Sequence, residues 1–362
     1  MSLFDPITLR CGLTLPNRVV LAPMTNQQSQ PDGLLGDDEY HWLARRADGG
    51  YGLLETCAAY VGLDGKAWPG ELGIDRDACL PGLTKLAKRL TTPDCKPMVQ
   101  LFHGGVRATQ ALTGEQVWSA STWHEDGPTF ETPRVATTDD LARVIEQFAA
   151  AAARAEQAGF AGVELHGAHG YLLCQFLSRT MNPRSDGWGG DLAGRARLIR
   201  EVARAIRARV SKSFAVGARL SLEDWGQARG MDLDDSLQVA NWLVDDGCDF
   251  IHVSLWNVDK MSAKRPDEHP ITATRAALPR DIPVIACGSM WSRADADAAM
   301  ARGADLIALG RAAILNPEWP TAARDPAWQP RRPPMSRAEL VERAVSPQLV
   351  GYLTRWKNLV SD

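Results

Sequence analysis

Cysteine motifs, long apolar runs and an excess of positive charge are all missing from this sequence. Its seven cysteines have no short spacing, which excludes a cysteine-ligated iron–sulfur cluster of the usual type and indicates reduced thiols. No stretch approaches about 18 uninterrupted apolar residues, so we expect no membrane span. Lys and Arg number 40 against 44 Asp and Glu, and a net charge of −4 provides no global attraction to nucleic acid or to an anionic membrane.

The amino terminus and the composition exclude two further classes of protein. Residues 1–6 (MSLFDP) contain neither a basic region nor an apolar core, so we expect no secretory signal peptide and a cytoplasmic location. Apolar residues make up 45% of the chain and charged residues 23%, which are ordinary values for a globular protein. The chain is therefore neither mostly disordered nor collagen-like.

Eight short apolar segments alternate with longer segments of helical pattern. Apolar residues at consecutive positions predict strands that are buried on both faces, as in a parallel sheet. These segments are 19–24, 52–57, 97–101, 162–166, 215–220, 250–254, 283–288 and 306–310. The helical segments often start with Asp, Ser or Thr, and several end in Gly before the next strand. They are 37–48, 81–89, 137–158, 195–210, 234–246 and 292–302.

Eight β-α units in one chain predict a (β/α)8 TIM barrel. The alternative, a doubly wound open sheet, usually carries G-x-G-x-x-G after its first strand, and no such motif follows residues 19–24 here. Residues 104–136 form a long insertion after the third strand, where barrels often carry a substrate lid or wall. We expect a single-domain barrel over 1–324, with a Pro-rich linker and tail over 325–362 that pack on the barrel or on a neighbouring subunit.

The active site of such a barrel lies at the carboxyl ends of its strands, and these ends carry no Asp, Glu or Lys. A metal hydrolase or a Schiff-base aldolase is therefore disfavoured. The groups present are neutral hydrogen-bonding residues with two His, one Tyr and two Arg, which suit an anionic, planar cofactor with a phosphate. The last two strands supply the candidate phosphate site, since Gly288-Ser289 and Gly310-Arg311 follow them. The alternative for Gly310-Arg311 is a turn with a surface charge.

His166, His169 and Tyr171 form the sharpest local motif, at the end of the fourth strand. The two histidines suggest three alternatives: a zinc pair, two structural histidines, or two donors aimed at a carbonyl or nitro oxygen with Tyr171 as a proton source. No third ligand candidate stands at another strand end, so we favour the donors and predict no metal site.

This motif belongs to a longer pattern that resembles the Old Yellow Enzyme family of FMN-dependent ene-reductases. The stretch 163–173 (VELHGAHGYLL) continues into 175–178 (QFLS) and 182–190 (NPRSDGWGG). Further agreement lies in Asn17-Arg18 and in 22–25 (APMT), 100–103 (QLFH), 219–221 (RLS) and 310–311 (GR). The agreement covers residues 3 to about 320, in order and with the spacing of a barrel.

The resemblance implies noncovalent FMN, with NAD(P)H as co-substrate. The implied FMN-binding residues are Pro23, Met24, Thr25, Ala58, Gln100, His166, Arg219, Gly288, Ser289, Gly310 and Arg311. Thr25 would contact a flavin carbonyl, Gln100 would bind the pyrimidine end, and Arg219 would stabilise the negative charge of the reduced ring. His166 and His169 would bind the substrate oxygen, and Tyr171 would protonate the α-carbon of an activated alkene.

The implied activity is a ping-pong reduction of activated C=C bonds in enones, enals and nitroalkenes. The chain departs from the family pattern at Gln27, where one subgroup has Tyr, and at His169, where other members have Asn. The tail segment 352–356 (YLTRW), with Arg355, weakly resembles the C-terminal segment from which some members insert an arginine into a neighbouring subunit's active site. We expect a small-molecule alkene as the partner, with no nucleic acid or membrane, in a monomer or homodimer. Two rivals are an FMN barrel that acts on RNA, which would need a basic face, and a non-catalytic flavin-binding protein.

Overall fold

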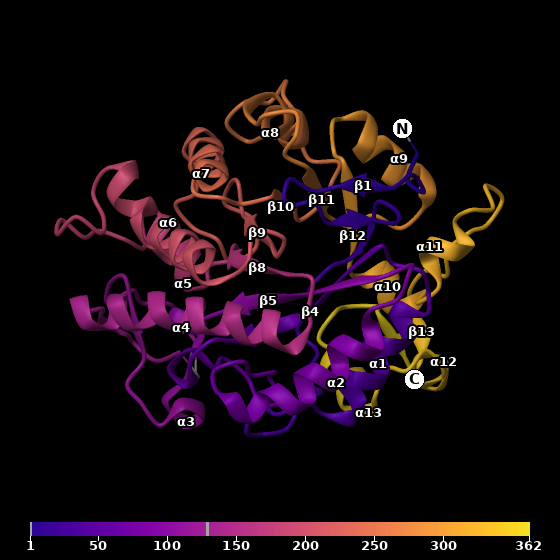
Figure 1. Ribbon diagram of the computed structural model, residues 1–362, viewed down its shortest axis with the longest axis horizontal. Helices are drawn as coiled ribbons and strands as arrows, with labels where there is room; N and C mark the ends of the chain where they lie inside the picture. Colours follow the sequence, from indigo (N-terminus) through magenta and orange to yellow (C-terminus); the bar gives the residue numbers. More distant parts are fainter. Residues whose placement is uncertain (1, 128–129) are drawn as a thin grey trace.

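A computed structural model of the chain describes residues 2–127 and 130–362, and its centre is a closed barrel of eight parallel strands (Figure 1). The strands follow one another around the ring in chain order, and the last pairs with the first. They are β3 (Val19–Leu21), β4 (Leu53–Tyr60), β5 (Lys96–Phe102), β8 (Gly162–Gly167), β9 (Ala215–Leu220), β10 (Phe250–Ser254), β11 (Val284–Cys287) and β12 (Leu306–Leu309). The predicted (β/α)8 fold is confirmed.

Helices surround the barrel, and their boundaries carry recognisable caps. The helix α4 begins with a capping box, in which the Thr137 hydroxyl and the Asp140 carboxylate each bond the other residue's backbone N–H. It ends at Gly159, whose φ of 93° lies in the left-handed region that glycine adopts without strain. The outer helices are α1 (Asp37–Ala47), α2 (Leu80–Leu90), α4 (Thr138–Ala158), α6 (Leu192–Arg209), α7 (Leu233–Asp245), α8 (Pro270–Ala277), α9 (Arg293–Ala301) and α10 (Arg311–Leu315).

A short hairpin that the sequence analysis does not predict closes the amino-terminal end of the barrel. It pairs β1 (Ile7–Thr8) with β2 (Thr14–Leu15). Leu9 and Leu15 are buried in one apolar cluster with Phe250 and other residues near the strand starts. This end is therefore filled with apolar side chains, and the polar groups described below lie towards the other end.

The insertion 104–136 packs on the side of the barrel. It contains α3 (Gln110–Thr113), β6 (Trp118–Ser119) and β7 (Arg134–Val135). The buried indole of Trp118 donates to Asp64 at 3.0 Å, and the Ser119 hydroxyl donates to Gln175 at 2.7 Å. These anchors tie the insertion to the segments that follow β4 and β8, and none of its described residues lines the cavity reported below. The expectation that it forms a substrate lid or wall is therefore wrong for that cavity.

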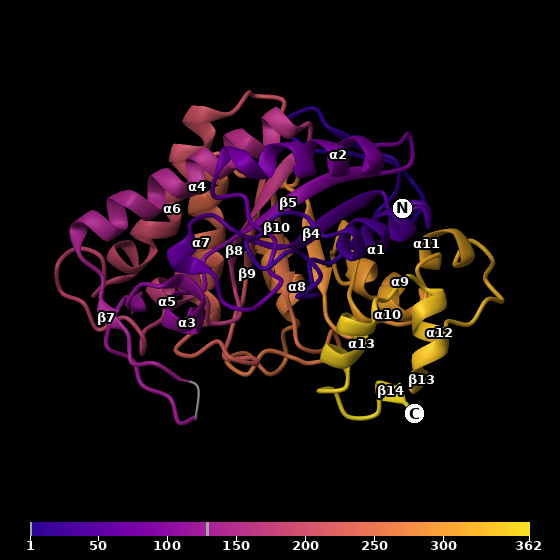
Figure 2. The same ribbon diagram turned by 90° about the horizontal axis from the view of Figure 1, so that it is seen from below.

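The carboxyl-terminal segment packs against the same barrel, on the side opposite the insertion (Figure 2). It contains β13 (Met335–Ser336), α12 (Arg337–Glu342), α13 (Pro347–Leu353) and β14 (Val360–Ser361), and the short α11 (Trp319–Ala322) precedes it. The Arg343 guanidinium donates to the carbonyl of Leu315 at 2.8 Å, and Arg46 donates to the carbonyl of Arg343 at the same distance. Within the described part of the chain, no helix has both the length and the apolar character needed to cross a membrane.

Candidate active site

A cavity of about 670 Å³ lies at the carboxyl ends of the barrel strands. It has a volume typical of a site for a small molecule or cofactor. All the residues that the sequence analysis assigns to FMN or to the substrate line it, although they come from seven different strands or strand ends. They are Pro23, Met24, Thr25, Ala58, Gln100, His166, His169, Tyr171, Arg219, Gly288, Ser289, Gly310 and Arg311.

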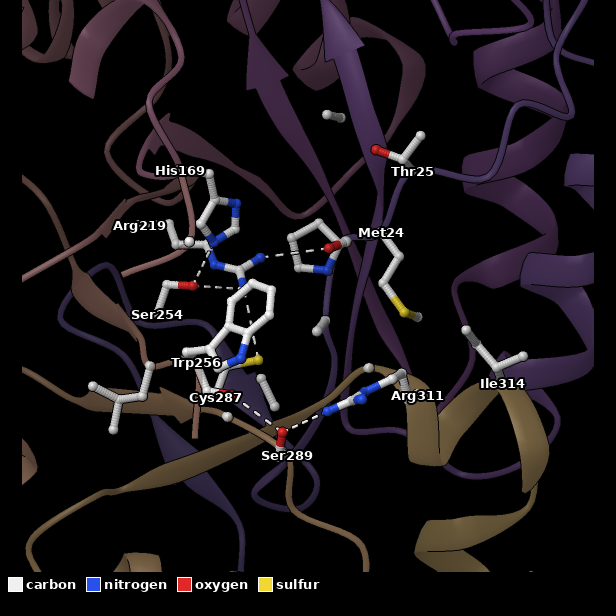
Figure 3. A pocket seen from close by; sticks show the side chains of 18 of the residues that line it. Met24, Thr25, His169, Arg219, Ser254, Trp256, Cys287, Ser289, Arg311 and Ile314 are labelled. Atoms are coloured by element: carbon white, nitrogen blue, oxygen red, sulfur yellow. Dashed lines mark hydrogen bonds between the residues drawn. The ribbon is translucent and has the colours of Figure 1, made fainter. Parts of the chain in front are cut away.

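The candidate phosphate site lies at one end of this cavity, where Ser289 and Arg311 face each other (Figure 3). The Arg311 guanidinium donates to Ser289 Oγ at 2.5 Å, and it has no carboxylate partner within the described ranges. Gly288 lies so close to β10 that an added Cβ would come within 2.7 Å of the Leu255 carbonyl oxygen. The Arg311 guanidinium has no anionic partner, and the neighbouring loop packs so closely that only glycine fits at position 288. Both features suit the binding of a phosphate group.

Arg219 lies deeper in the cavity and is also a cation without an ion-pair partner among the described residues. Its guanidinium is 5% exposed and contacts only neutral groups, which are the Ser254 hydroxyl at 3.0 Å, the Pro23 carbonyl at 3.4 Å and the Cys287 sulfur at 3.6 Å. Its Nε has no hydrogen-bond partner. Burying an unpaired charge is costly, so this side chain fits a site for an anionic or electron-rich group such as a flavin ring.

Residues at the ends of β3, β4 and β5 line another part of the cavity. Ala58 and Gln100 are paired neighbours on β4 and β5, beyond a shift of register between Glu55 and Ala58. Gln100 is 1% exposed and donates through Nε2 to Glu164 at 2.7 Å. Met24 lies on the other side, with its sulfur 3.4 Å from the place where a Cβ on Gly310 would stand. A small alanine and an absent Cβ leave space for a planar ring.

The two histidines and Tyr171 meet at the opposite end of the cavity from Arg311. The ring centroids lie 4.9 Å apart for His166–His169 and 5.0 Å apart for His166–Tyr171. His169 has a φ of 62°, which turns its ring inward, and its Nε2 forms a 2.6 Å hydrogen bond with Ser254 Oγ. His166 Nδ1 accepts from the backbone N–H of Ala168 at 3.4 Å, which assigns the ring proton to Nε2.

Burial sets the protonation of these three side chains. Burial, followed by the neighbouring His169 ring and then the charge of Arg219, lowers the pKa of His166 well below its usual value. Burial and Arg219 lower the pKa of His169 in the same way. Burial also raises the pKa of Tyr171 above its usual value of about 10. At neutral pH the site therefore holds two uncharged imidazoles beside a protonated phenol.

Several aromatic lining residues are missed by the sequence analysis. They are Trp68, Trp225, Trp256, Trp291, Tyr352 and Trp356, and only the fold brings them together. Burial raises the pKa of Tyr352, and a hydrogen bond with the Thr25 side chain opposes that rise. Tyr352 lies on α13, so the tail of the chain lines its own cavity. Arg355 stacks on Tyr352 with its guanidinium carbon 5.0 Å from the ring centroid.

Comparisons with known proteins match nearly the whole barrel to flavin oxidoreductases. The NADH:flavin oxidoreductase / NADH oxidase family matches residues 2–326. A probable NADH-dependent flavin oxidoreductase of Bacillus subtilis, YqiG, is 34% identical over 333 residues, which cover 89% of this chain and 88% of that protein.

Two solved structures share the fold at similar lengths. The old yellow enzyme homologue of Zymomonas mobilis superposes with a TM-score of 0.84 at 25% identity, covering 96% of this chain and 98% of that one. Morphinone reductase in complex with tetrahydroNAD also has a TM-score of 0.84, at 26% identity, covering 100% of this chain and 98% of that one.

The unpaired Arg219 and Arg311, the residues that share their cavity and these likenesses agree on one cofactor, FMN, with NAD(P)H as co-substrate. This chain is a flavin oxidoreductase that belongs to the NADH:flavin oxidoreductase / NADH oxidase family, the family of the Old Yellow Enzymes.

Proposed function

We propose that this enzyme reduces the C=C bond of activated alkenes, such as enones, enals and nitroalkenes, in a ping-pong cycle with NAD(P)H. The main support for this proposal is the group formed by His166, His169 and Tyr171. In this group two neutral imidazoles, which can donate N–H, lie beside a protonated phenol in one cavity. When bound, FMN supplies the hydride transfer between NAD(P)H and the β-carbon of the alkene.

The two histidines bind the electron-withdrawing oxygen of the substrate. Negative charge builds on that oxygen as the β-carbon gains a hydride, so donors aimed at it stabilise the transition state more than the ground state. Neutral imidazoles donate without losing a proton, and the lowered pKa values keep both rings neutral. The Ser254 hydroxyl forms a hydrogen bond with Nε2 of His169 and holds this ring in place. The substrate oxygen would then either replace the hydroxyl as the partner of Nε2 or share Nε2 with it.

Tyr171 delivers the proton to the α-carbon. Its ring is held by an edge contact with Phe102 at 4.5 Å between centroids and by Trp68 at 6.3 Å. These contacts fix the direction of the hydroxyl relative to the histidines. A phenol with a raised pKa remains protonated through the neutral range and can act as a general acid.

The activity is tested by the two half-reactions of the purified holoenzyme under anaerobic conditions. NAD(P)H should bleach the flavin absorbance, and 2-cyclohexenone should restore it with formation of cyclohexanone. Double-reciprocal plots at several NAD(P)H concentrations should be parallel. Heat should release the flavin, and the released flavin should co-migrate with FMN. Bleaching by NAD(P)H without reoxidation by any enone or nitroalkene would reject the proposed activity and leave only a flavin reductase.

A further inference from the structure

Three ionisable side chains meet inside the barrel beneath the cavity without lining it. They are Glu55 on β4, Glu164 on β8 and His252 on β10, and each is 0% exposed. One polar atom from each of the three side chains lies within 4.8 Å of the other two. Each is an ionisable side chain inside a fully buried strand, where an uncompensated charge is costly, so apolar packing does not explain the cluster.

Glu164 is the centre of the cluster and has both oxygens engaged. Its Oε2 lies 2.7 Å from His252 Nδ1, and its Oε1 accepts from Gln100 Nε2 at 2.7 Å. Glu55 differs, because neither of its oxygens has a hydrogen-bond donor among the described residues, and His252 Nδ1 is 3.9 Å away. A fully buried carboxylate without a donor is very costly, whereas a carboxylic acid could donate its own proton to Glu164.

Six strands of the barrel contribute a group that bears on the charge of the cluster or bonds to it. These groups are Glu55 (β4), Gln100 (β5), Glu164 (β8), Arg219 (β9), His252 (β10) and Cys287 (β11). Burial and the neighbouring Glu164 raise the pKa of Glu55 well above its usual value. Burial acts against ionised Glu164 and against cationic His252, but the attraction between the two groups lowers the pKa of Glu164 and raises that of His252.

The state of Glu164 decides which way the Gln100 amide points. An ionised carboxylate only accepts hydrogen bonds, so the NH₂ group of Gln100 must face Glu164. The carbonyl oxygen of Gln100 is then on the other branch of the amide, available to the cavity that this residue lines. The pyrimidine ring of a flavin carries one N–H between two carbonyl groups, and an acceptor at Gln100 matches that N–H.

We propose that Glu55, Glu164 and His252 form a buried positioning cluster, in which the Glu55 acid and the His252 cation hold Glu164 as the anion that orients Gln100 for FMN. The cluster also determines the charge beneath the flavin. With Glu55 neutral, the charges of Arg219, His252 and Glu164 sum to one positive charge. The inference rests on the bound cofactor and does not depend on which alkene the enzyme reduces.

The same three residue types could in principle ligate a divalent cation. The 2.7 Å separation of His252 Nδ1 and Glu164 Oε2 is that of a direct charge-assisted hydrogen bond, which occupies the atoms that a cation would need. A stoichiometric metal in the purified protein, lost in Glu55→Gln, would overturn the positioning cluster in favour of a metal site.

The first test measures FMN binding to apoprotein by quenching of flavin fluorescence. Glu55→Gln keeps a neutral donor towards Glu164, and its dissociation constant should stay within about twofold of that of the wild type. Glu55→Leu has no donor, so its constant should rise by about tenfold or more. Circular-dichroism melting of each apoprotein reports folding independently. If both variants fold and have the same FMN dissociation constant, whether raised or unchanged relative to the wild type, the proposed role of the Glu55 proton is overturned.

The second test measures the midpoint potential of bound FMN, which a purely structural role would not move. Glu55→Gln should leave the potential unchanged, because an uncharged amide replaces an uncharged acid. His252→Gln keeps a donor to Glu164 but removes a positive charge, so the potential should fall. A rise in Glu55→Gln would mean that Glu55 is ionised in the wild type, and an unchanged potential in His252→Gln would mean that His252 is neutral. Either result overturns the proposal, and both measurements remain decisive if Glu55→Leu does not fold.

Discussion

The two ends of the cavity are made from different kinds of side chain. At the phosphate end, Ser289 and Arg311 are exposed, and the attraction there is a charge close to water. At the reaction end, His166 is 5% exposed while His169 and Tyr171 are half-buried, and burial keeps all three uncharged. Water screens a charge at the rim, whereas a hydrogen bond in a dry site is stronger and its loss is more costly. The phosphate end should therefore contribute affinity, and the reaction end should contribute rate.

The largest effect should come from Tyr171→Phe, which removes one hydroxyl and keeps the ring packed on Phe102. Flavin bleaching by NAD(P)H should be near normal, because it needs no proton donor beside the alkene. Reoxidation by 2-cyclohexenone should slow by roughly 10²–10⁴-fold, the usual contribution of a positioned general acid. Anaerobic stopped-flow absorbance separates the two steps. Slowing of the reductive step alone would remove Tyr171 from the proposed role.

A smaller effect is expected from His166→Ala, which removes one donor from the reaction end. Phenolic ligands should bind more weakly by roughly 1–3 kcal/mol, because a buried oxygen loses its hydrogen bond. FMN should remain bound. Charge-transfer absorbance during titration with a phenol gives the affinity, and His124→Ala in the insertion is the matched control. Equal loss in both variants would show that the change is not specific to the cavity.

Changing the exposed cation, Arg311→Gln, should have a modest effect on the other end. FMN affinity should fall several-fold, and the difference should shrink as salt rises, because an exposed charge is screened. Once the enzyme is saturated with FMN, the rate of reoxidation by enone should be unchanged. Fluorescence titration at two salt concentrations measures this, with Lys212→Gln, exposed ahead of β9 at the far end of the barrel, as the control. A salt-independent loss would place Arg311 in a drier site than described.

The smallest effect is expected from pH. The pKa of Tyr171 is raised, so its proton is present throughout the neutral range and is lost only above its usual value of about 10. The pKa values of His166 and His169 are lowered, so both rings gain a proton only in acid, well below about pH 6.5. The rate of reoxidation by enone should therefore be flat from about pH 7 to about pH 9. A step inside that range would assign a titrating group to the reaction.

The same contrast explains which parts of the molecule the sequence predicts. Strands 215–220 and 250–254 coincide with the observed β9 and β10, because an apolar run inside a barrel has no alternative register. The predicted first strand, 19–24, ends earlier, at Leu21, because residues 22–25 leave the ladder to line the cavity. Motifs at strand ends are predictable because the barrel brings all strand ends to one face.

Contacts between distant segments are not predictable in this way. Trp256 and Tyr352 line the same cavity from positions nearly a hundred residues apart, and neither lies in a motif. Glu55 and Glu164 carry a signal of their own in the sequence, since each is a carboxylate inside a strand that is otherwise free of charged residues. Both residues lie before the ends of their strands, so the residues at the strand ends do not reveal that they meet, and only the closed barrel brings them together.

The most direct test of the account is the ratio of two reoxidation rates in Tyr171→Phe, one with a nitroalkene and one with 2-cyclohexenone. A nitroalkene forms an anion stable enough to wait for a proton from water, whereas an enone needs the positioned phenol. The account predicts that the variant retains fast reoxidation by the nitroalkene and loses it with the enone, so that the ratio rises by roughly 10²-fold or more over that of the wild type. An unchanged ratio, with both substrates slowed alike or neither slowed, would contradict the assignment of hydride acceptance and proton delivery to separate groups at the reaction end.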